Sequence, residues 1–325
     1  SHLRKVPSIA VGCMRLSEKS KDEMNHFIHS ALEQGAYFFD HADIYGSGMS
    51  ETVFGDAFAS DPSLHREDVL IQSKCGIRQG CYDLSKEHIL ESVDGILKRL
   101  QTDYLDLYQV HWPQRPTNCF GKLGYTWADA APAVTLLDTL EALTEFQRAG
   151  KIRYIGVSNE TAFGVMRYLH LADKHDLPRI VTIQNPYSLL NRSFEVGLAE
   201  VSQFEGVELL AYSCLAFGTL TGKYLNGAKP AGARNTLFSR FTRYSSEQSQ
   251  KAVAAYVDIA KRHGLDPAQM ALAFVRRQPF VASTLLGATT MTQLQANVES
   301  LQLELSEEVL AEIEAVHQVY TYPAP

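Results

Sequence analysis

Four side chains that could act together in proton transfer lie between positions 40 and 111 of the chain: Asp40, Tyr45, Lys74 and His111. A phenol loses its proton at about pH 10 when nothing perturbs it. Tyr45 could therefore donate a proton near neutral pH only with help from a cation such as Lys74. Each of the four residues stands at or just past the C-terminal end of a short apolar run. We refer to them below as the quartet.

Apolar runs of strand length alternate with longer helical patterns, as in repeated βα units. The runs are continuously apolar, which is typical of strands buried on both faces. Eight such units favour a closed (β/α)8 TIM barrel, a single α/β domain over residues 1–325, rather than a doubly wound open sheet. The C-terminal ends of the strands in such a barrel meet at one mouth, where the quartet would converge. The predicted strands are 8–13, 37–40, 69–74, 105–111, 152–158, 180–184, 207–212 and 282–286.

Helix starts are predicted at Ser20, which forms a capping box with Glu23, and at Ser85. Segments 112–132 and 214–246, after the fourth and seventh strands, are too long for ordinary βα loops and should lie on the face of the mouth. An extra helix is predicted over 306–319, after the eighth unit.

Composition excludes several classes of protein. The chain has 325 residues, 45% of them hydrophobic, and a net charge of −7 with interspersed charges, which argues against a nucleic-acid partner. No apolar run reaches the length of about 18 residues that a membrane span needs, so no membrane partner is expected. Five scattered cysteines without metal-like spacing predict reduced thiols, a cytoplasmic location and no metal site. No oligomeric state follows from the sequence.

Three motifs resemble those of the aldo-keto reductase family: FFDHADIYG at 38–46, SKCG at 73–76 and YQVHWP at 108–113. The resemblance extends over nearly the whole chain. It implies a TIM barrel and hydride transfer from NADPH to an aldehyde or ketone carbonyl. By the same resemblance Tyr45 would be the general acid, Lys74 would lower its pKa, Asp40 would pair with Lys74, and His111 would orient the carbonyl. Taken singly, each of the four could instead be a cap, a core aromatic, a solvated strand end or a buried histidine.

The same resemblance implies residues that would hold the cofactor. Ser158, Asn159 and Gln184 would bind the nicotinamide carboxamide, although Ser158 and Asn159 could instead cap a strand end. Tyr212 would stack on the nicotinamide ring. The pyrophosphate would be bound by the segment after Tyr212 and by two cations of the same long loop, a set made of Ser213, Cys214, Leu215, Gly218, Lys223 and Arg234.

Residues from both ends of the chain complete the implied cofactor site. Gly12 and Met14 would line its floor, and a helix predicted to start near residue 292 would receive a 2′-phosphate at its N-terminus. Many family members carry Lys or Arg where this chain has Gln293, and Glu where it has Ala296, so Arg234 would supply the missing charge. NADPH is favoured over NADH. The residues implied near that helix are Gly287, Thr289, Gln293 and Asn297.

The substrate would be a small carbonyl compound held beside Tyr45 and His111. Trp112, Tyr125 and Trp127, in the first long segment, could wall an apolar pocket, and ordinary loop packing explains them equally well. Two other functions stay open: a cofactor-binding regulatory subunit with weak catalysis, since potassium-channel β subunits share this fold and quartet, and a barrel enzyme of unrelated chemistry. The first hundred residues resemble a different branch of the family from the rest. The chain is therefore either a natural divergent member or a recombined chain with its seam near 100–106, and recombination is favoured.

Overall fold

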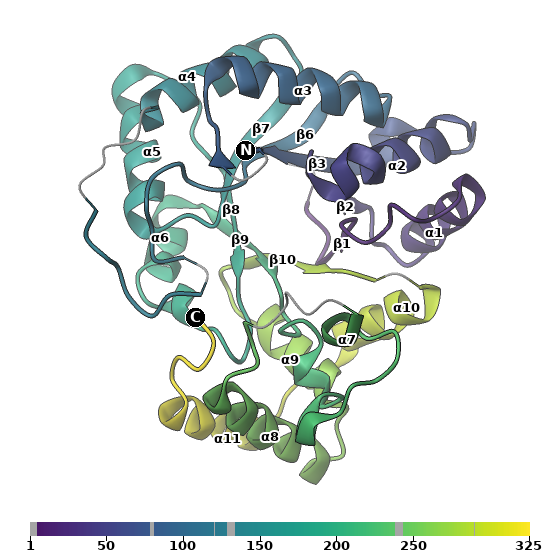
Figure 1. Cartoon of the computed structure of the whole chain (residues 1–325), viewed down its shortest axis with the longest axis vertical. Helices are drawn as coiled ribbons and strands as arrows, with labels where there is room; N and C mark the ends of the chain where they lie inside the picture. Colours follow the sequence, from purple (N-terminus) through teal and green to yellow (C-terminus); the bar gives the residue numbers. More distant parts are fainter. Residues whose placement is uncertain (1–4, 79–80, 120, 129–133, 238–242, 289) are drawn as a thin grey trace.

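In the computed structural model, which describes residues 5–78, 81–119, 121–128, 134–237, 243–288 and 290–325, parallel strands close into a barrel (Figure 1). Their order around the barrel is β1-β10-β9-β8-β7-β6-β3-β2. The predicted TIM barrel is therefore confirmed, and every strand lies within two residues of its predicted bounds. The barrel strands are β1 Ile9–Gly12, β2 Phe38–Asp40, β3 Leu70–Cys75, β6 Leu105–Val110, β7 Ile152–Ser158, β8 Thr182–Pro186, β9 Glu208–Tyr212 and β10 Val281–Leu286.

Helices surround the barrel, and local capping explains where several of them begin (Figure 1). Ser20 Oγ accepts from Glu23 N at 3.2 Å while Glu23 Oε2 accepts from Ser20 N at 2.7 Å, so the predicted capping box forms. Ser85 caps α3, also as predicted. The helices are α1 Lys21–Glu33, α2 Met49–Ala59, α3 Lys86–Leu100, α4 Leu136–Arg148, α5 Ala162–His175, α6 Leu198–Glu205, α7 Arg234–Leu237, α8 Glu247–Arg262, α9 Pro267–Arg276, α10 Met291–Glu299 and α11 Glu307–Val319.

The interior of the barrel changes from apolar to polar along its axis. Alternate residues of a strand face the same side, so Leu70, Gln72 and Lys74 of β3 all point inwards at rising height. An apolar layer fills the end where the strands begin, and polar side chains follow it towards the mouth. The apolar layer consists of Ala10, Phe38, Leu70, Leu107, Leu210 and Leu285.

Three features lie outside the simple βα repeat. A small hairpin of β4 Ile77–Arg78 and β5 Cys81–Tyr82 directly follows β3 and was not predicted. In the described residues three α-helices, α7, α8 and α9, separate β9 from β10, and α8 packs beside α11, the predicted extra helix (Figure 1). The backbone oxygen of Pro325 accepts from Gly121 N at 2.9 Å and from Arg243 Nε at 2.6 Å, so the tail connects the two long segments.

Within the described residues, none of the helices combines the length and the apolar character needed to cross a lipid bilayer.

Candidate active site

The quartet occupies the ends of three neighbouring strands. Asp40 is the last residue of β2, Lys74 lies next to the end of β3, and His111 directly follows β6. Tyr45 begins a short 3-10 turn, Tyr45–Gly48, in the segment after β2. Gly46 follows with φ of 55°, a left-handed conformation that glycine adopts without strain. This turn brings the hydroxyl of Tyr45 back to the end of Lys74.

Lys74 lies at the centre of the quartet. Its Nζ donates to Asp40 Oδ1 at 2.5 Å, to the backbone oxygen of His41 at 2.7 Å and to Tyr45 Oη at 3.1 Å. These acceptors match the three donor hydrogens of an ammonium group. Burial alone would lower the pKa of Lys74, but Asp40 and Tyr45 raise it above its usual value. Lys74 is therefore held as a buried cation.

Tyr45 is a protonated donor at neutral pH. Burial raises the pKa of Tyr45 to about 12, and Lys74 acts in the opposite direction. From the sequence, Lys74 is instead predicted to lower the pKa of Tyr45 below its usual value. The direction of the lysine's own effect agrees with that prediction, but burial outweighs it because a phenolate is poorly stabilised away from water.

His111 faces Tyr45 edge to face, with 6.2 Å between the ring centroids and 85° between the ring planes. Burial, and then the charge of Lys74, lowers the pKa of His111 well below its usual value. The imidazole is therefore neutral at physiological pH and can offer one donor and one acceptor nitrogen. Its Nδ1 is buried and has no hydrogen-bond partner among the described residues.

Side chains at the ends of β7, β8 and β9 are tied to one another. Ser158 Oγ donates to the backbone oxygen of Gln184 at 2.8 Å, and Asn159 Nδ2 donates to the backbone oxygen of His111 at 3.1 Å. Tyr212 Oη donates to Asn159 Oδ1. Ser158 and Asn159 thus link strand ends, which agrees with the alternative prediction that they cap a strand end. They also lie beside the quartet.

One buried residue at this site was missed by the sequence analysis. Gln72 Nε2 donates to Asp40 Oδ1 at 2.6 Å and to Gln184 Oε1 at 2.8 Å. The only sequence signal was its spacing of two residues from Lys74, which places both side chains on the inner face of β3.

The segment after β9 contains four residues with a left-handed backbone conformation. Ser213, Ala216 and Phe217 have φ of 53°, 50° and 56°, and Gly218 follows at 82°. Cys214 is buried and Leu215 packs against the hydrophobic core. The four left-handed residues turn the chain sharply over the edge of the barrel.

Two arginines lie close enough to Lys223, beside this segment, to influence its pKa. Burial lowers the pKa of Lys223, and the charges of Arg15 and Arg234 lower it further. The guanidinium of Arg234 lies 5.1 Å from the ring centroid of Phe217. Arg15 was not predicted, although it directly follows Met14. Such a group of like charges favours an anion.

The remaining predicted cofactor residues lie where β1 and β10 end and where α10 begins. Gly12 packs next to Leu286 and Gly287, and Met14 is partly exposed. Thr290 caps α10 by accepting from Gln293 N at 3.2 Å, and Asn297 lies one turn further along the helix. The predicted helix start near residue 292 is thus confirmed. Thr289 lies outside the described residues.

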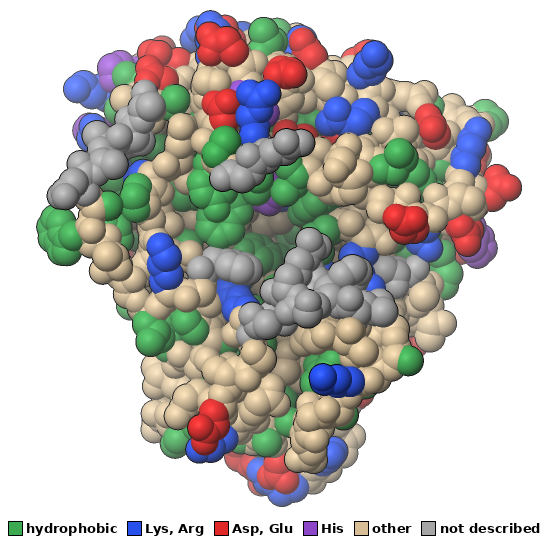
Figure 2. Space-filling model, in the orientation of Figure 1, with side chains coloured by type: hydrophobic (Ala, Val, Ile, Leu, Met, Phe, Trp, Pro, Cys, Tyr) green, Lys and Arg blue, Asp and Glu red, His purple; other side chains and the backbone are tan. Residues whose placement is uncertain are grey.

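The predicted substrate residues do not form one wall. Trp112 stacks on Tyr82 of the β4–β5 hairpin, with 5.7 Å between ring centroids and 17° between planes. Tyr125 and Trp127 form an edge-to-face pair at 6.4 Å, and Trp127 is 92% exposed. Tyr125 also lines a groove of about 540 Å³ together with Arg115 and Phe163, but no member of the quartet lines it. Figure 2 shows hydrophobic side chains around a hollow over the strands.

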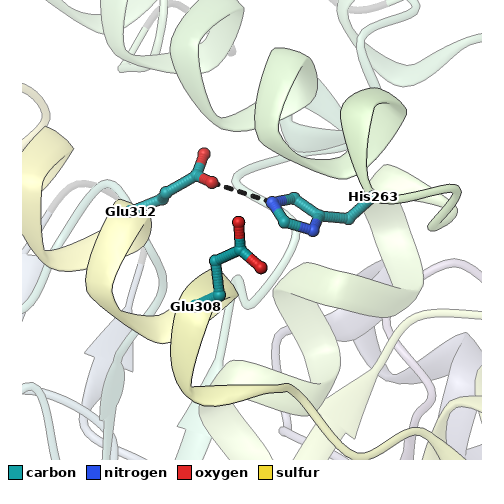
Figure 3. A group of neighbouring side chains, drawn as sticks. All are labelled: His263, Glu308 and Glu312. Carbon is teal, nitrogen blue, oxygen red and sulfur yellow. Dashed lines mark hydrogen bonds and ion pairs between the residues drawn. The ribbon is translucent and has the colours of Figure 1, made fainter.

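Among the described residues, His263, Glu308 and Glu312 form one group whose ligand atoms lie within 4.8 Å of one another (Figure 3). Glu312 Oε1 is already paired with His263 Nε2 at 2.8 Å, and its other oxygen is paired with Arg262. The group belongs to the α8–α11 pair and not to the quartet.

Comparisons with known proteins establish the family of this chain. The profile described as "Aldo/keto reductase family" matches residues 8–318. The chain belongs to the aldo/keto reductase family. Oxidoreduction of carbonyl compounds is therefore supported as its general activity. The family resemblance of the three sequence motifs is confirmed.

Three relatives show the range of this aldo/keto reductase's similarities. "Protein tas" of Escherichia coli (strain K12) is 71% identical over 98% of this chain and 96% of its own length. An "Aldo-keto reductase" of Babesia bovis is 38% identical over 68% of this chain and 82% of its own length. A "Putative voltage-gated potassium channel subunit beta" of Schizosaccharomyces pombe is 31% identical over 89% of this chain and 82% of its own length. The likeness to protein tas includes the first hundred residues, and a separate origin for that segment stays a prediction.

Proposed function

We propose that this protein reduces aldehyde or ketone carbonyls to alcohols with NADPH, with Tyr45 as the general acid. The observation that carries the proposal is the contact of one buried ammonium group with both a carboxylate and a phenol: Lys74 Nζ is 2.5 Å from Asp40 Oδ1 and 3.1 Å from Tyr45 Oη. We further propose that the chain acts as a single domain in the cytoplasm on small molecules, without a nucleic-acid or membrane partner.

The residues around the mouth fit a dinucleotide. Arg15, Lys223 and Arg234 offer positive charge for phosphates, and the polar ends of β7 and β8 offer donors and acceptors for an amide. Tyr212 lies beside Asn159 at the same mouth and offers an aromatic face. Bound NADPH would supply the hydride, and the residues of the chain would supply the proton and the charge balance.

Proton donation by Tyr45 is favourable once negative charge develops on the carbonyl oxygen. An alkoxide is a base of about the strength of hydroxide, and the pKa of its conjugate acid lies well above that of a phenol. Tyr45, with a pKa of about 12, is the stronger acid, so its proton moves to the alkoxide and leaves a phenolate. Lys74 Nζ, which lies 3.1 Å from Tyr45 Oη, then stabilises that phenolate. Neutral His111 would offer a hydrogen bond to the oxygen of the substrate carbonyl.

Turnover tests the proposal directly. Purified protein mixed with NADPH and a panel of aldehydes and ketones should show loss of the nicotinamide absorbance and formation of the alcohol. Cofactor binding without reduction of any carbonyl would contradict the enzymatic proposal. That outcome would favour a second candidate, a cofactor-binding regulatory subunit, for which the observation is the 31% identity to a putative potassium-channel β subunit.

The pH dependence of reduction should follow Tyr45. Only the protonated phenol can donate, and it predominates below its pKa of about 12, so the rate should stay level from neutral to moderately alkaline pH and fall as the pH approaches 12. Single-turnover rates measured across this range check the expectation. A fall centred below about pH 10, the value for an unperturbed phenol, would show that another group limits the rate.

Cofactor choice should depend on Arg234. Arg234→Gln removes a cation from the Arg15–Lys223–Arg234 group and should weaken NADPH binding by about tenfold, the loss of one charged hydrogen bond, with a smaller effect on NADH. Fluorescence titrations with both cofactors measure this. Arg179→Gln is the control, since Arg179 pairs with Asp173 and Glu205 near the end of α5. Equal weakening of NADPH and NADH would show that Arg234 does not contact the 2′-phosphate.

A further inference from the structure

The side-chain amide of Gln72 donates both of its hydrogens to groups of the proposed site. The residue is fully buried inside the barrel on β3, two residues before Lys74. Its Nε2 donates to Asp40 Oδ1 at 2.6 Å and to Gln184 Oε1 at 2.8 Å. One amide therefore joins the carboxylate that pairs with Lys74 to the glutamine proposed to bind the nicotinamide carboxamide.

The chemistry of these partners fixes the orientation of both amides. A carboxylate only accepts hydrogen bonds, so the atom of Gln72 that faces Asp40 must be nitrogen. The same nitrogen faces Gln184, which must then present its oxygen. The nitrogen of Gln184 is then the atom that donates one hydrogen to Asp40 Oδ2, at 3.4 Å, on the same carboxylate that Gln72 contacts. Its second hydrogen has no acceptor among the described residues.

We propose that Gln72 is a positioning residue that holds Gln184 as a hydrogen-bond donor towards the carboxamide oxygen of the nicotinamide. This inference rests on the proposed function and goes beyond it, because Gln72 acts through Gln184 and does not itself contact the cofactor. The N–H of Gln184 can donate only to the carboxamide oxygen and not to the carboxamide nitrogen, so the ring is bound in one of its two orientations. Because Gln72 also contacts Asp40, which pairs with Lys74, the position of this donor is fixed relative to Lys74 and Tyr45.

A matched pair of substitutions separates this role from general packing. Gln72→Met keeps the length of the side chain and removes both hydrogen bonds. Gln109→Met is the control, because Gln109 is equally buried on β6, in register with Lys74, and donates only to Thr182 Oγ1 at 3.4 Å. Two ligands are titrated by fluorescence: NADPH, and adenosine 2′,5′-bisphosphate, which lacks the nicotinamide.

Gln72→Met should weaken NADPH binding by about tenfold, the effect of one lost hydrogen bond in a buried site, and leave binding of the bisphosphate unchanged. Gln109→Met should change neither. In a Gln184→Met background, Gln72→Met should have no further effect on NADPH binding, since it acts through Gln184. Gln72→Asn, which keeps an amide that is one methylene too short, should reproduce the loss.

Unchanged NADPH binding in Gln72→Met, equal weakening of both ligands, or an additive loss in the Gln184→Met background would overturn the inference. If Gln72→Met does not fold, Gln72→Asn with the same two ligands decides between these outcomes. Failure of the wild-type protein to bind NADPH would instead overturn the proposed function. The two failures are thus distinguished by the wild-type titration.

Discussion

Replacing Tyr45 with phenylalanine should lower the rate of carbonyl reduction by about 10²- to 10⁴-fold, the usual contribution of a general acid. The ring stays in place and only the hydroxyl that receives the hydrogen bond from Lys74 is lost. Cofactor affinity should remain unchanged, because the phenol is proposed to act on the substrate oxygen. Single-turnover absorbance measurements give the rate, and fluorescence titration gives the affinity.

Tyr256→Phe is the control for this substitution. Tyr256 is buried in α8, and its hydroxyl has no hydrogen-bond partner among the described residues, so its removal should not alter the rate. A Tyr45→Phe protein that retains the wild-type rate would refute the role of Tyr45 as general acid, while leaving the fold and the family unaffected.

Replacing Lys74 with methionine should lower the free energy of unfolding by about 3 to 5 kcal/mol and abolish reduction. Lys74 and Asp40 are both buried, with side-chain exposures of 0% and 4%, so the substitution leaves a carboxylate in the barrel without its counter-charge. Removal of one partner of a buried ion pair costs more than removal of both, because the remaining charge is not solvated. Urea denaturation measures the change.

The double variant Asp40→Asn/Lys74→Met should recover much of this stability and none of the activity. Both groups are then neutral, and the oxygen of the new amide can still accept the hydrogen bond from Gln72 Nε2. If the double variant is as unstable as Lys74→Met alone, the loss comes from packing around the lysine stem and the ion-pair explanation is wrong.

Much of the fold was predictable because barrel strands carry a local signal. Each barrel strand is a short apolar run, and Ser20 and Ser85 mark helix starts through contacts three residues away. The β4–β5 hairpin escaped prediction because each of its strands has two residues, too few to show alternation.

The site was predictable to the extent that strand ends define it. Asp40, Lys74 and His111 could be placed at the mouth from sequence position alone. The contact between Gln72 and Gln184 joins residues 112 positions apart and depends on the closure of the barrel. Arg15 was missed for the same reason, since its charge matters only next to Lys223. Trp127 was an aromatic in a polar segment, and its exposure could not be deduced from its type.

The change from apolar to polar side chains along the barrel axis determines the direction in which the electric field of Lys74 extends. Hydrocarbon at the base polarises weakly, and water at the mouth polarises strongly, so the electric field of the buried ion pair is concentrated towards the open end. A negative charge that forms next to the buried Lys74 is attracted by a cation that is less screened than it would be in bulk water. The apolar layer from Ala10 to Leu285 therefore acts as an electrical insulator as well as a core.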